Sequence, residues 1–517
     1  MTEVLPSLIA GTWTTGSGEG TTVHDAVTGD PVVRVTSEGL DLASAVEHAR
    51  RVGGPALRAL DFAERAAMLK ACAVAVSERK QELYDLSARA GATRGDAKVD
   101  VDGGFGTALV YASLGRKGLP AGKVVVEGPA EPLGKEGTFL GQHILTSRPG
   151  VALQINAFNF PVWGMLEKLA PALLAGVPTI VKPATQTAYV AERAVRIMEE
   201  AGVLPEGALQ LVSGSLPGVL DLLGGQDLVG FTGSAATAAK LRGHAAVTER
   251  SVRFNAEADS LNCSVLGPDA TAGTPEFDLY VEALVTEMTT KAGQKCTAIR
   301  RAFVPRELVD EVAEAVSARL SEVVVGAPGA ENVTMGALVG LDQRDDVRRA
   351  VSALLAESSL VHGDPEKVDV VGADADRGAF LSPLLLRADA SASAPHEVEA
   401  FGPVSTLLPY DGTEQLLEQV GRGRGSLVGS VVTHDPGFAR DVVLGAAALH
   451  GRFLVLDRDD AGESTGHGIP MPQLVHGGPG RAGGGEEEGG LRAVYHHMQR
   501  TAVQAGPAML EALTRTE

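Results

Sequence analysis

Short apolar segments alternate with amphipathic helices between residues 151 and 241, and this alternation constrains the fold more than any other feature. Residues 151–155, 178–182, 208–212 and 227–231 are mostly apolar and are predicted to be buried strands. Residues 188–201 have helical spacing and end at Gly202, and a second helix is expected to run through Leu241. Strands separated by helices are typical of a parallel sheet with right-handed crossovers. We therefore expect an α/β fold with ligands at the carboxyl ends of the strands.

Three other segments complete the expected organisation. Residues 62–90 have helical spacing, and residues 122–149 contain two β-rich runs separated by Gly and Pro turns. We interpret the latter as an antiparallel arm. A second α/β run is expected over residues 260–470. The glycine-rich stretch at 477–490 is either a flexible linker or an ordered loop, and the helical segment after it argues against a simple tail.

Composition excludes several classes of function. The 517 residues suggest about three domains at ~150 residues each. A net charge of −20 and only 4% aromatic residues disfavour nucleic acid as a partner. The N-terminus has no basic region typical of a signal peptide, and no apolar run reaches the length of a membrane span. Three cysteines are too few for a disulfide framework, so we expect a soluble, cytoplasmic protein.

Cys296 is the first candidate for chemistry. It lies in Gly-Gln-Lys-Cys-Thr, residues 293–297, where Lys295 or a helix N-terminus could favour the thiolate. The alternative is a structural cysteine in the core. We assign the other two cysteines, Cys72 and Cys263, to core packing because both lie in apolar patterns.

Glu257 and Asn159 are candidates for a base and an oxyanion donor. Glu257 lies among small residues without a cationic neighbour at helical spacing, so we expect a raised pKa and a general-base role. Asn159, in Asn-Ala-Phe-Asn-Phe-Pro at a strand end, could donate its amide to an oxyanion. The alternatives are an acid in a surface loop and a loop cap.

Lys182 and the turn at Gly233 and Ser234 are candidates for binding phosphate or ribose. Lys182 ends a predicted buried strand, and Gly233-Ser234 joins a strand to a helix, where N–H groups can bind phosphate. This turn is not the three-glycine dinucleotide fingerprint. Considered alone, Lys182 could equally reach into solvent.

Six motifs occur together in one order along the chain: Asn-Phe-Pro, Lys-Pro-Ala, Phe-Thr-Gly-Ser, Glu257, Gly-Gln-Lys-Cys and Glu399-Ala-Phe401-Gly-Pro. In this order and combination the chain resembles the NAD(P)-dependent aldehyde dehydrogenase superfamily, from about residue 8 to residue 505. The resemblance implies a Rossmann-type cofactor domain, an α/β catalytic domain and a small β oligomerisation arm. The domains would cover residues 1–121 with 150–258, 259–475, and 122–149 with 476–517, respectively.

The resemblance also assigns roles to the candidate residues. Cys296 attacks the aldehyde, Asn159 and the Cys296 N–H hold the oxyanion, and Glu257 activates water to hydrolyse the thioester. Further residues would bind the cofactor: Lys182, Thr185, Gly233, Ser234, Glu399 and Phe401. No metal site is expected, because the histidines near the glycine-rich stretch, His467 and His476, lack a recognisable zinc spacing. We expect these histidines to lie in a substrate-side or interdomain loop.

The chain departs from the family pattern in two places that bear on specificity. Thr185 stands where many NAD-preferring members have a glutamate, so we expect NADP, with NAD as an alternative cofactor. Residues 257–262 read Glu-Ala-Asp-Ser-Leu-Asn in place of the usual Glu-Leu-Gly-Gly-Lys, which also makes Asp259 a lesser candidate acid.

Together with His-Gly-Gly-Pro-Gly-Arg-Ala at 476–482, these departures resemble the branch that oxidises CoA-linked semialdehydes in aerobic aromatic degradation. The alternatives are the dehydrogenase half of the bifunctional phenylacetate-pathway enzyme and a broad aliphatic aldehyde dehydrogenase. We expect no hydratase domain after His497, and an assembly that is a homodimer or a dimer of dimers.

Overall fold

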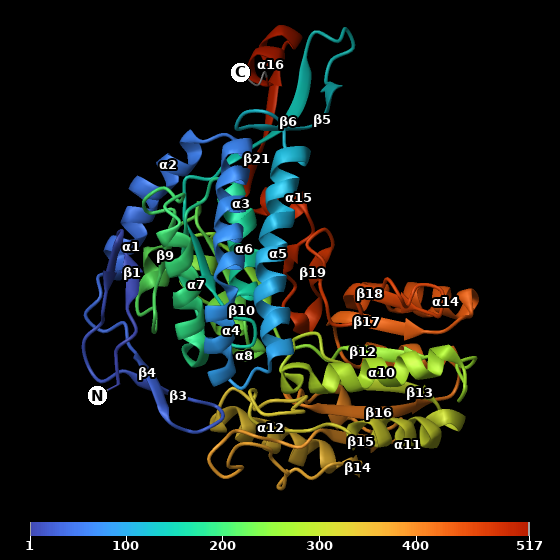
Figure 1. Ribbon diagram of the computed structural model, residues 1–517. Helices are drawn as coiled ribbons and strands as arrows, with labels where there is room; N and C mark the ends of the chain where they lie inside the picture. The colour runs from blue at the N-terminus through green and yellow to red at the C-terminus, as the bar shows by residue number, and fades with distance from the viewer. Residues whose placement is uncertain (1, 515–517) are drawn as a thin grey trace.

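The computed structural model describes residues 2–514, which form two large seven-stranded sheets (Figure 1). The first has the order β11-β10-β7-β8-β9-β1-β2, and its strands from β11 to β9 are parallel. Its strands are β1 (Ser7–Ile9), β2 (Thr12–Thr14), β7 (Ala152–Ile155), β8 (Thr179–Lys182), β9 (Leu209–Leu211), β10 (Leu228–Thr232) and β11 (Arg253–Glu257). The four strands predicted between residues 151 and 231 are therefore present, as a parallel sheet.

Long helices pack against this sheet and share one core with it. They are α3 (Phe62–Glu78), α4 (Lys80–Arg89), α5 (Arg94–Gly118), α6 (Trp163–Leu174) and α7 (Ala188–Glu200). Capping boxes fix the starts of α3 and α5, with Asp61 and Thr93 as the N-cap residues. The helical segment expected at 62–90 forms two helices, because Arg79 leaves the helical conformation at φ −111°. Shorter helices α1 (Leu42–His48), α2 (Gly54–Ala59), α8 (Ala235–Arg242) and α9 (Ala245–Thr248) and the hairpin of β3 (Thr21–His24) and β4 (Pro31–Val35) complete this part.

The second sheet has the order β14-β15-β16-β13-β12-β17-β18 and is parallel except for β14. Its strands are β12 (Cys263–Leu266), β13 (Arg301–Pro305), β14 (Ser358–His362), β15 (Leu384–Ala388), β16 (Val404–Tyr410), β17 (Ser426–Val432) and β18 (His450–Leu456). Its helices are α10 (Pro275–Thr289), α11 (Val309–Leu320), α12 (Leu341–Leu355), α13 (Gly412–Gly421) and α14 (Pro436–Ala446). Cys72 in α3 and Cys263 in β12 are buried in the two cores, as expected.

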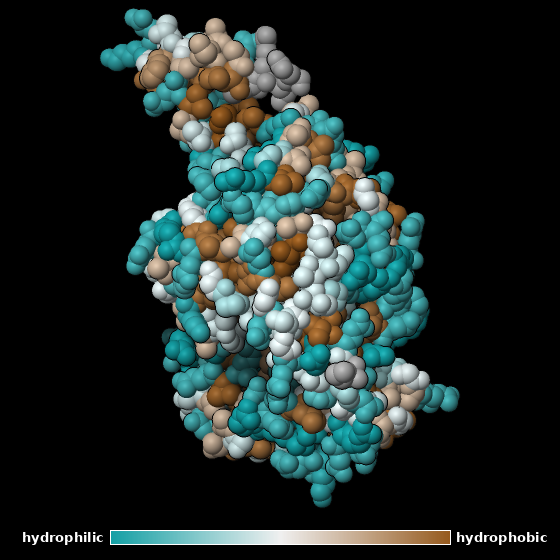
Figure 2. Space-filling view, turned by 90° about the vertical axis from the view of Figure 1, so that its left-hand side faces the viewer, coloured by the Kyte–Doolittle hydropathy of each residue, from teal (hydrophilic) through white to brown (hydrophobic). Residues whose placement is uncertain are grey.

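A three-stranded antiparallel sheet rises from one end of the molecule (Figure 1). It consists of β5 (Val125–Pro132), β6 (Leu140–Ser147) and β21 (Met498–Ala505), and α16 (Pro507–Thr514) packs beside it. Apolar side chains gather on this projection (Figure 2), where Leu133, Phe139, Met509 and Leu513 are exposed. Within residues 2–514, no helix combines the length and the apolar character needed to span a membrane.

The glycine-rich stretch is an ordered hairpin, so the flexible-linker interpretation is wrong. Its strands β19 (Val475–Gly477) and β20 (Glu486–Glu488) are antiparallel, and α15 (Leu491–His496) follows. The hairpin lies directly on β11, with the Gly485 N–H donating to the carbonyl oxygen of Ala256. A Cβ atom at Gly483 would lie 2.2 Å from that same oxygen, so the close approach requires glycine.

Candidate active site

Three distant segments bring Asn159, Glu257 and Cys296 to one place. Asn159 lies in the loop between β7 and α6, Glu257 is the last residue of β11, and Cys296 follows a 3₁₀ turn at Thr290–Gly293. All three border each of two cavities, so Cys296 lies where the two cavities meet. A side chain in this position can contact one molecule from each side.

The larger cavity has a volume of about 540 Å³ and lies at the carboxyl ends of the strands of the first sheet. All six residues predicted to bind the cofactor border it: Lys182, Thr185, Gly233, Ser234, Glu399 and Phe401. The structure thus brings these residues together, while their individual roles stay predictions.

The second cavity is narrow, about 40 Å³, and mostly apolar. Phe160 and Trp163 line one part, and Ile469 and Pro470 contribute from the late segment before the hairpin. The sequence predicted a substrate-side or interdomain loop for that late segment. An apolar channel ending at Cys296 suits an aliphatic chain better than a charged group.

The structure adds His476 to this site, a residue that the sequence placed only in a glycine-rich loop. His476 is the central residue of β19, buried, and its Nε2 lies 3.2 Å from Glu257 Oε2. The same nitrogen lies 4.0 Å from Cys296 Sγ. The spacing of 180 residues between Cys296 and His476 explains why no local motif could pair them.

The electrostatics of Glu257 differ from the expectation. Burial alone would raise its pKa, as the sequence predicted, but His476 and then Lys168 oppose burial and hold the pKa of Glu257 below its ordinary value. The expectation of a raised pKa is therefore wrong, because it omitted His476. The pKa of His476 is raised by Glu257 and Cys296 despite its burial, so the imidazolium form is favoured.

The Cys296 thiol is not activated in the way the sequence suggested. Burial and the neighbouring Glu257 carboxylate raise its pKa to about 12, and His476 acts in the opposite direction. The ammonium of Lys295 is instead buried against Glu287, with Nζ 2.7 and 2.8 Å from the two carboxylate oxygens. The segment around Cys296 is not a helix N-terminus. Of the groups around this thiol, His476 has the largest effect in lowering its pKa.

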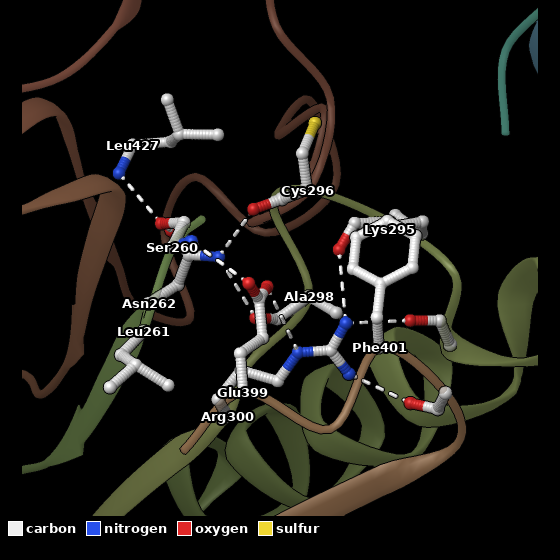
Figure 3. Close-up of polar contacts among 12 residues, drawn as sticks. Ser260, Leu261, Asn262, Lys295, Cys296, Ala298, Arg300, Glu399, Phe401 and Leu427 are labelled. Atoms are coloured by element: carbon white, nitrogen blue, oxygen red, sulfur yellow. Dashed lines mark hydrogen bonds and ion pairs between the residues drawn. The ribbon is translucent and has the colours of Figure 1, made fainter. Parts of the chain in front are cut away.

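Two buried side chains, Asn262 and Arg300, hydrogen-bond to backbone carbonyls of the loop that carries Cys296 (Figure 3). Asn262 Nδ2 donates to the carbonyl oxygen of Cys296 at 2.7 Å and of Ala298 at 3.0 Å. Arg300 donates to the carbonyl oxygens of Lys295 and Gly402, and its guanidinium lies 5.5 Å from the centre of the Phe401 ring. The unusual sequence after Glu257 thus supplies, through Asn262, a support for the loop that carries Cys296.

A buried group of charges lies behind Glu257. Lys168 Nζ lies 2.9 Å from Glu167 Oε1 and 2.8 Å from Glu487 Oε2. Burial raises the pKa of Glu487 to about 7 and of Glu488 to about 8. Groups that titrate near neutral pH can exchange protons with a neighbouring carboxylate such as Glu257.

The larger cavity fits a dinucleotide in three respects. Glu399 has one buried carboxylate oxygen, Oε1, without a hydrogen-bond partner in residues 2–514, and a ribose hydroxyl could donate to it. Helix α8 opens onto the cavity at its N-cap Ser234, and Asp259, which also borders the cavity, accepts from the Ala235 N–H at 2.8 Å. Within residues 2–514 no carboxylate pairs with Lys182, and burial alone lowers the pKa of its ammonium, so this group is available to a phosphate.

Comparison with known proteins identifies the family. Residues 13–448 match the model of the aldehyde dehydrogenase family. The chain belongs to this family. It is 48% identical to 3,4-dehydroadipyl-CoA semialdehyde dehydrogenase of Aromatoleum evansii, over 92% of this chain and 93% of that protein. The aldehyde dehydrogenase expected from the six motifs is therefore confirmed.

Solved structures show the same fold at lower identity. Betaine aldehyde dehydrogenase of Staphylococcus aureus, in complex with NAD⁺, matches with a TM-score of 0.83 and 21% identity, covering 98% of this chain and 97% of that chain. PnpE from Pseudomonas sp. WBC-3 matches with a TM-score of 0.84 and 23% identity, covering 98% of both chains. These likenesses confirm the predicted fold of this dehydrogenase.

Proposed function

We propose that this aldehyde dehydrogenase oxidises an aliphatic CoA-linked semialdehyde, 3,4-dehydroadipyl-CoA semialdehyde, to the carboxylic acid with NADP. The main support for this chemistry is that Cys296, Glu257 and Asn159 lie together where the two cavities join. The identity of 48% with a dehydrogenase named for that substrate supports the substrate.

Acylation uses the nucleophile and the oxyanion donors of this chain. Cys296 Sγ attacks the aldehyde carbon and forms a thiohemiacetal, while the Asn159 amide and the Cys296 N–H donate to the developing oxyanion. Asn262 and Arg300 hold the loop through its carbonyl groups at Cys296 and Lys295. The oxyanion then collapses to the carbonyl of a thioester as the substrate carbon gives up its hydride; a nicotinamide cofactor held in the larger cavity would supply the hydride acceptor.

Deacylation uses Glu257 as the base. Its carboxylate accepts a proton from water, the hydroxide attacks the thioester carbon, and the C–S bond breaks to release the acid and the Cys296 thiolate. A base at this position supports hydrolysis, with CoA as a handle on the substrate and not as the acyl acceptor. An acyl-CoA-forming relative would need no such base.

The preference for NADP rests on the cavity wall around Lys182. The neutral Thr185 borders the same cavity as the unpaired ammonium of Lys182, and a 2′-phosphate would meet a cation without a repelling carboxylate at that position. NAD remains the alternative cofactor.

Three further assignments belong to the same proposal. The exposed apolar side chains of the projection pair with a second copy of the chain, which gives a homodimer or a dimer of dimers. The enzyme works in the cytoplasm, consistent with its free thiols. Its reaction belongs to the aerobic degradation of benzoate.

The test compares initial rates of NADPH formation with a CoA-linked C6 semialdehyde and with free hexanal at equal concentration. We expect a large preference for the thioester, faster reduction of NADP than of NAD, no requirement for added CoA, and no activity in Cys296→Ala. Equal rates with both aldehydes would overturn the CoA assignment and favour the second candidate, a broad aliphatic aldehyde dehydrogenase, which the apolar lining of the narrow cavity supports. Strict dependence on free CoA would overturn hydrolysis.

A further inference from the structure

His476 contacts both reacting side chains but has no part in the steps described above. Its Nε2 lies 3.2 Å from Glu257 Oε2 and 4.0 Å from Cys296 Sγ, so one N–H faces both the base and the nucleophile. Hydrogen bonds in a free active site are often longer than in the reacting complex, so the 4.0 Å between His476 Nε2 and Cys296 Sγ can shorten during the reaction.

The position of His476 is fixed by its strand. It pairs with Glu487 across the β19–β20 hairpin, and Gly477, which follows it, has a φ of +141° that only glycine adopts readily. A Cβ at Gly477 would lie 2.1 Å from the carbonyl oxygen of Gly485. The tight hairpin therefore holds the imidazole against Glu257 and leaves little freedom to turn away.

The charges around His476 favour its imidazolium form. Glu257 of β11 and Glu487 and Glu488 of β20 are the carboxylates around His476. The Cys296 thiol also faces it, and the Lys168 ammonium of α6 is paired with Glu487. Lys168 is itself paired with two carboxylates, Glu167 and Glu487. Lys295, next to Cys296 in the chain, is paired with Glu287, and the buried Arg300 and Arg452 add positive charge near Cys296. A proton on His476 thus has a carboxylate directly opposite it.

We propose that His476 is a further catalytic residue of this dehydrogenase: its imidazolium stabilises the Cys296 thiolate and keeps Glu257 ionised. Without His476, the thiolate would form in a buried site beside a carboxylate, which strongly disfavours it. With His476 present, the positive charge of its imidazolium faces both the Cys296 thiolate and the Glu257 carboxylate. The inference rests on the dehydrogenase chemistry, and it does not depend on whether the substrate carries CoA.

The proton changes balance over the two steps. In acylation the Cys296 thiol loses its proton to solvent, the C–S bond forms, and the carbonyl π electrons become the oxyanion at Asn159. His476 keeps its proton and faces the sulfur as its charge develops. In deacylation Glu257 accepts a proton from water, the C–S bond breaks, and the departing thiolate again meets the imidazolium of His476.

The test uses His476→Gln, which keeps an N–H donor and removes the charge. A matched control is His467→Gln, a buried histidine of the same late segment whose Nδ1 lies 2.8 Å from Ser430 Oγ and which does not border the cavities. The readouts are the rate of iodoacetamide alkylation of Cys296 against pH, followed by peptide mass spectrometry, and the pre-steady-state burst of reduced cofactor with hexanal.

We expect His476→Gln to slow both alkylation at pH 7 and the burst by about tenfold or more, equivalent to at least ~1.4 kcal/mol. We also expect deacylation to acquire an acidic limb, because the pKa of Glu257 rises once its cation is lost. His467→Gln should change neither rate. A folded His476→Gln enzyme with wild-type alkylation and burst rates would overturn the proposal.

A second variant covers the case in which glutamine does not fold. His476→Gly leaves space for a small base, and added imidazole should restore the burst while inert ethanol of similar concentration does not. Restoration that follows the protonated fraction of a series of substituted imidazoles supports a cation at this position. Failure of every imidazole to accelerate the burst in a folded variant would count against it.

Discussion

Asn262 Nδ2 lies 2.7 Å from the carbonyl oxygen of Cys296, and this contact ties the nucleophile loop to the start of β12 (Figure 3). The same amide reaches the carbonyl oxygen of Ala298, and Asn262 Oδ1 accepts from Ser260 and from the Val428 N–H. One buried side chain therefore connects the loop after Glu257, the nucleophile loop and β17.

Asn262→Ala should loosen the nucleophile loop. We expect a loss of about 1–3 kcal/mol in the free energy of unfolding, because two buried carbonyl groups lose their donor. We also expect a burst about tenfold slower, since the Cys296 N–H is no longer held in place. Denaturant titration and stopped-flow absorbance measure the two effects. Ser264→Ala, a buried change in the same strand, should lower stability without slowing the burst.

Glu257→Gln should separate the two chemical steps. We expect one equivalent of NADPH per site in a burst, followed by very slow turnover, because the acyl-enzyme lacks a base. Because the Glu257 carboxylate raises the pKa of the Cys296 thiol, the variant should also alkylate faster at pH 7 than the wild type. Loss of the burst itself would contradict the deacylation role.

Thr185→Glu should reverse the cofactor preference. A carboxylate beside Lys182 would neutralise its ammonium and repel a 2′-phosphate, so KM for NADP should rise at least tenfold while KM for NAD changes little. Steady-state kinetics with both cofactors provide the measurement. Thr248→Glu, an exposed change of equal charge outside the cavity, is the control and should alter neither KM.

Lys295→Met should affect stability and leave the thiol unchanged. Glu287 would remain buried without its partner, which costs about 3–5 kcal/mol of unfolding free energy. Lys295→Met combined with Glu287→Leu should recover part of that loss. If Lys295 activated Cys296, either variant would slow alkylation; we expect unchanged alkylation in the folded double variant.

Glu488→Gln should stabilise the enzyme at alkaline pH. Burial raises the pKa of Glu488 to about 8, above its value in an unfolded chain, so between these two pKa values the folded state binds a proton that the unfolded state has lost. As pH rises through 5 to 8, the unfolded carboxyl ionises more readily and stability falls. The variant should therefore melt a few degrees above the wild type at pH 8.5 and show a smaller difference at pH 5. An equal shift at both pH values would contradict this explanation.

Local patterns were sufficient to predict the strands that end at Lys182 and Glu257, because apolar runs and helix-stop signals lie within a few residues. The order of the six motifs likewise indicated the family. The resemblance to that family implied that Cys296, Glu257 and Asn159 share one site. The roles of these residues remain predictions that the variants above address.

His476 and Lys295 show where sequence reasoning fails. His476 reaches the site only because a glycine-rich hairpin packs on β11, and composition alone made that hairpin look like a linker. Lys295 is adjacent to Cys296 in sequence, yet its side chain points to Glu287, eight residues before it in the chain. Adjacency along the chain does not determine which side chains share a site; the backbone between them does.

The placement of Cys296 between two cavities has a consequence for the timing of release. Because the narrow apolar channel and the larger cavity reach the sulfur from different sides, an acyl group on Cys296 does not have to block the exit of the reduced cofactor. Departure of that cofactor would open room beside Glu257 for the hydrolytic water. We therefore expect oxidation, then exit of the cofactor, and only then hydrolysis, with the acyl-enzyme outliving the first product.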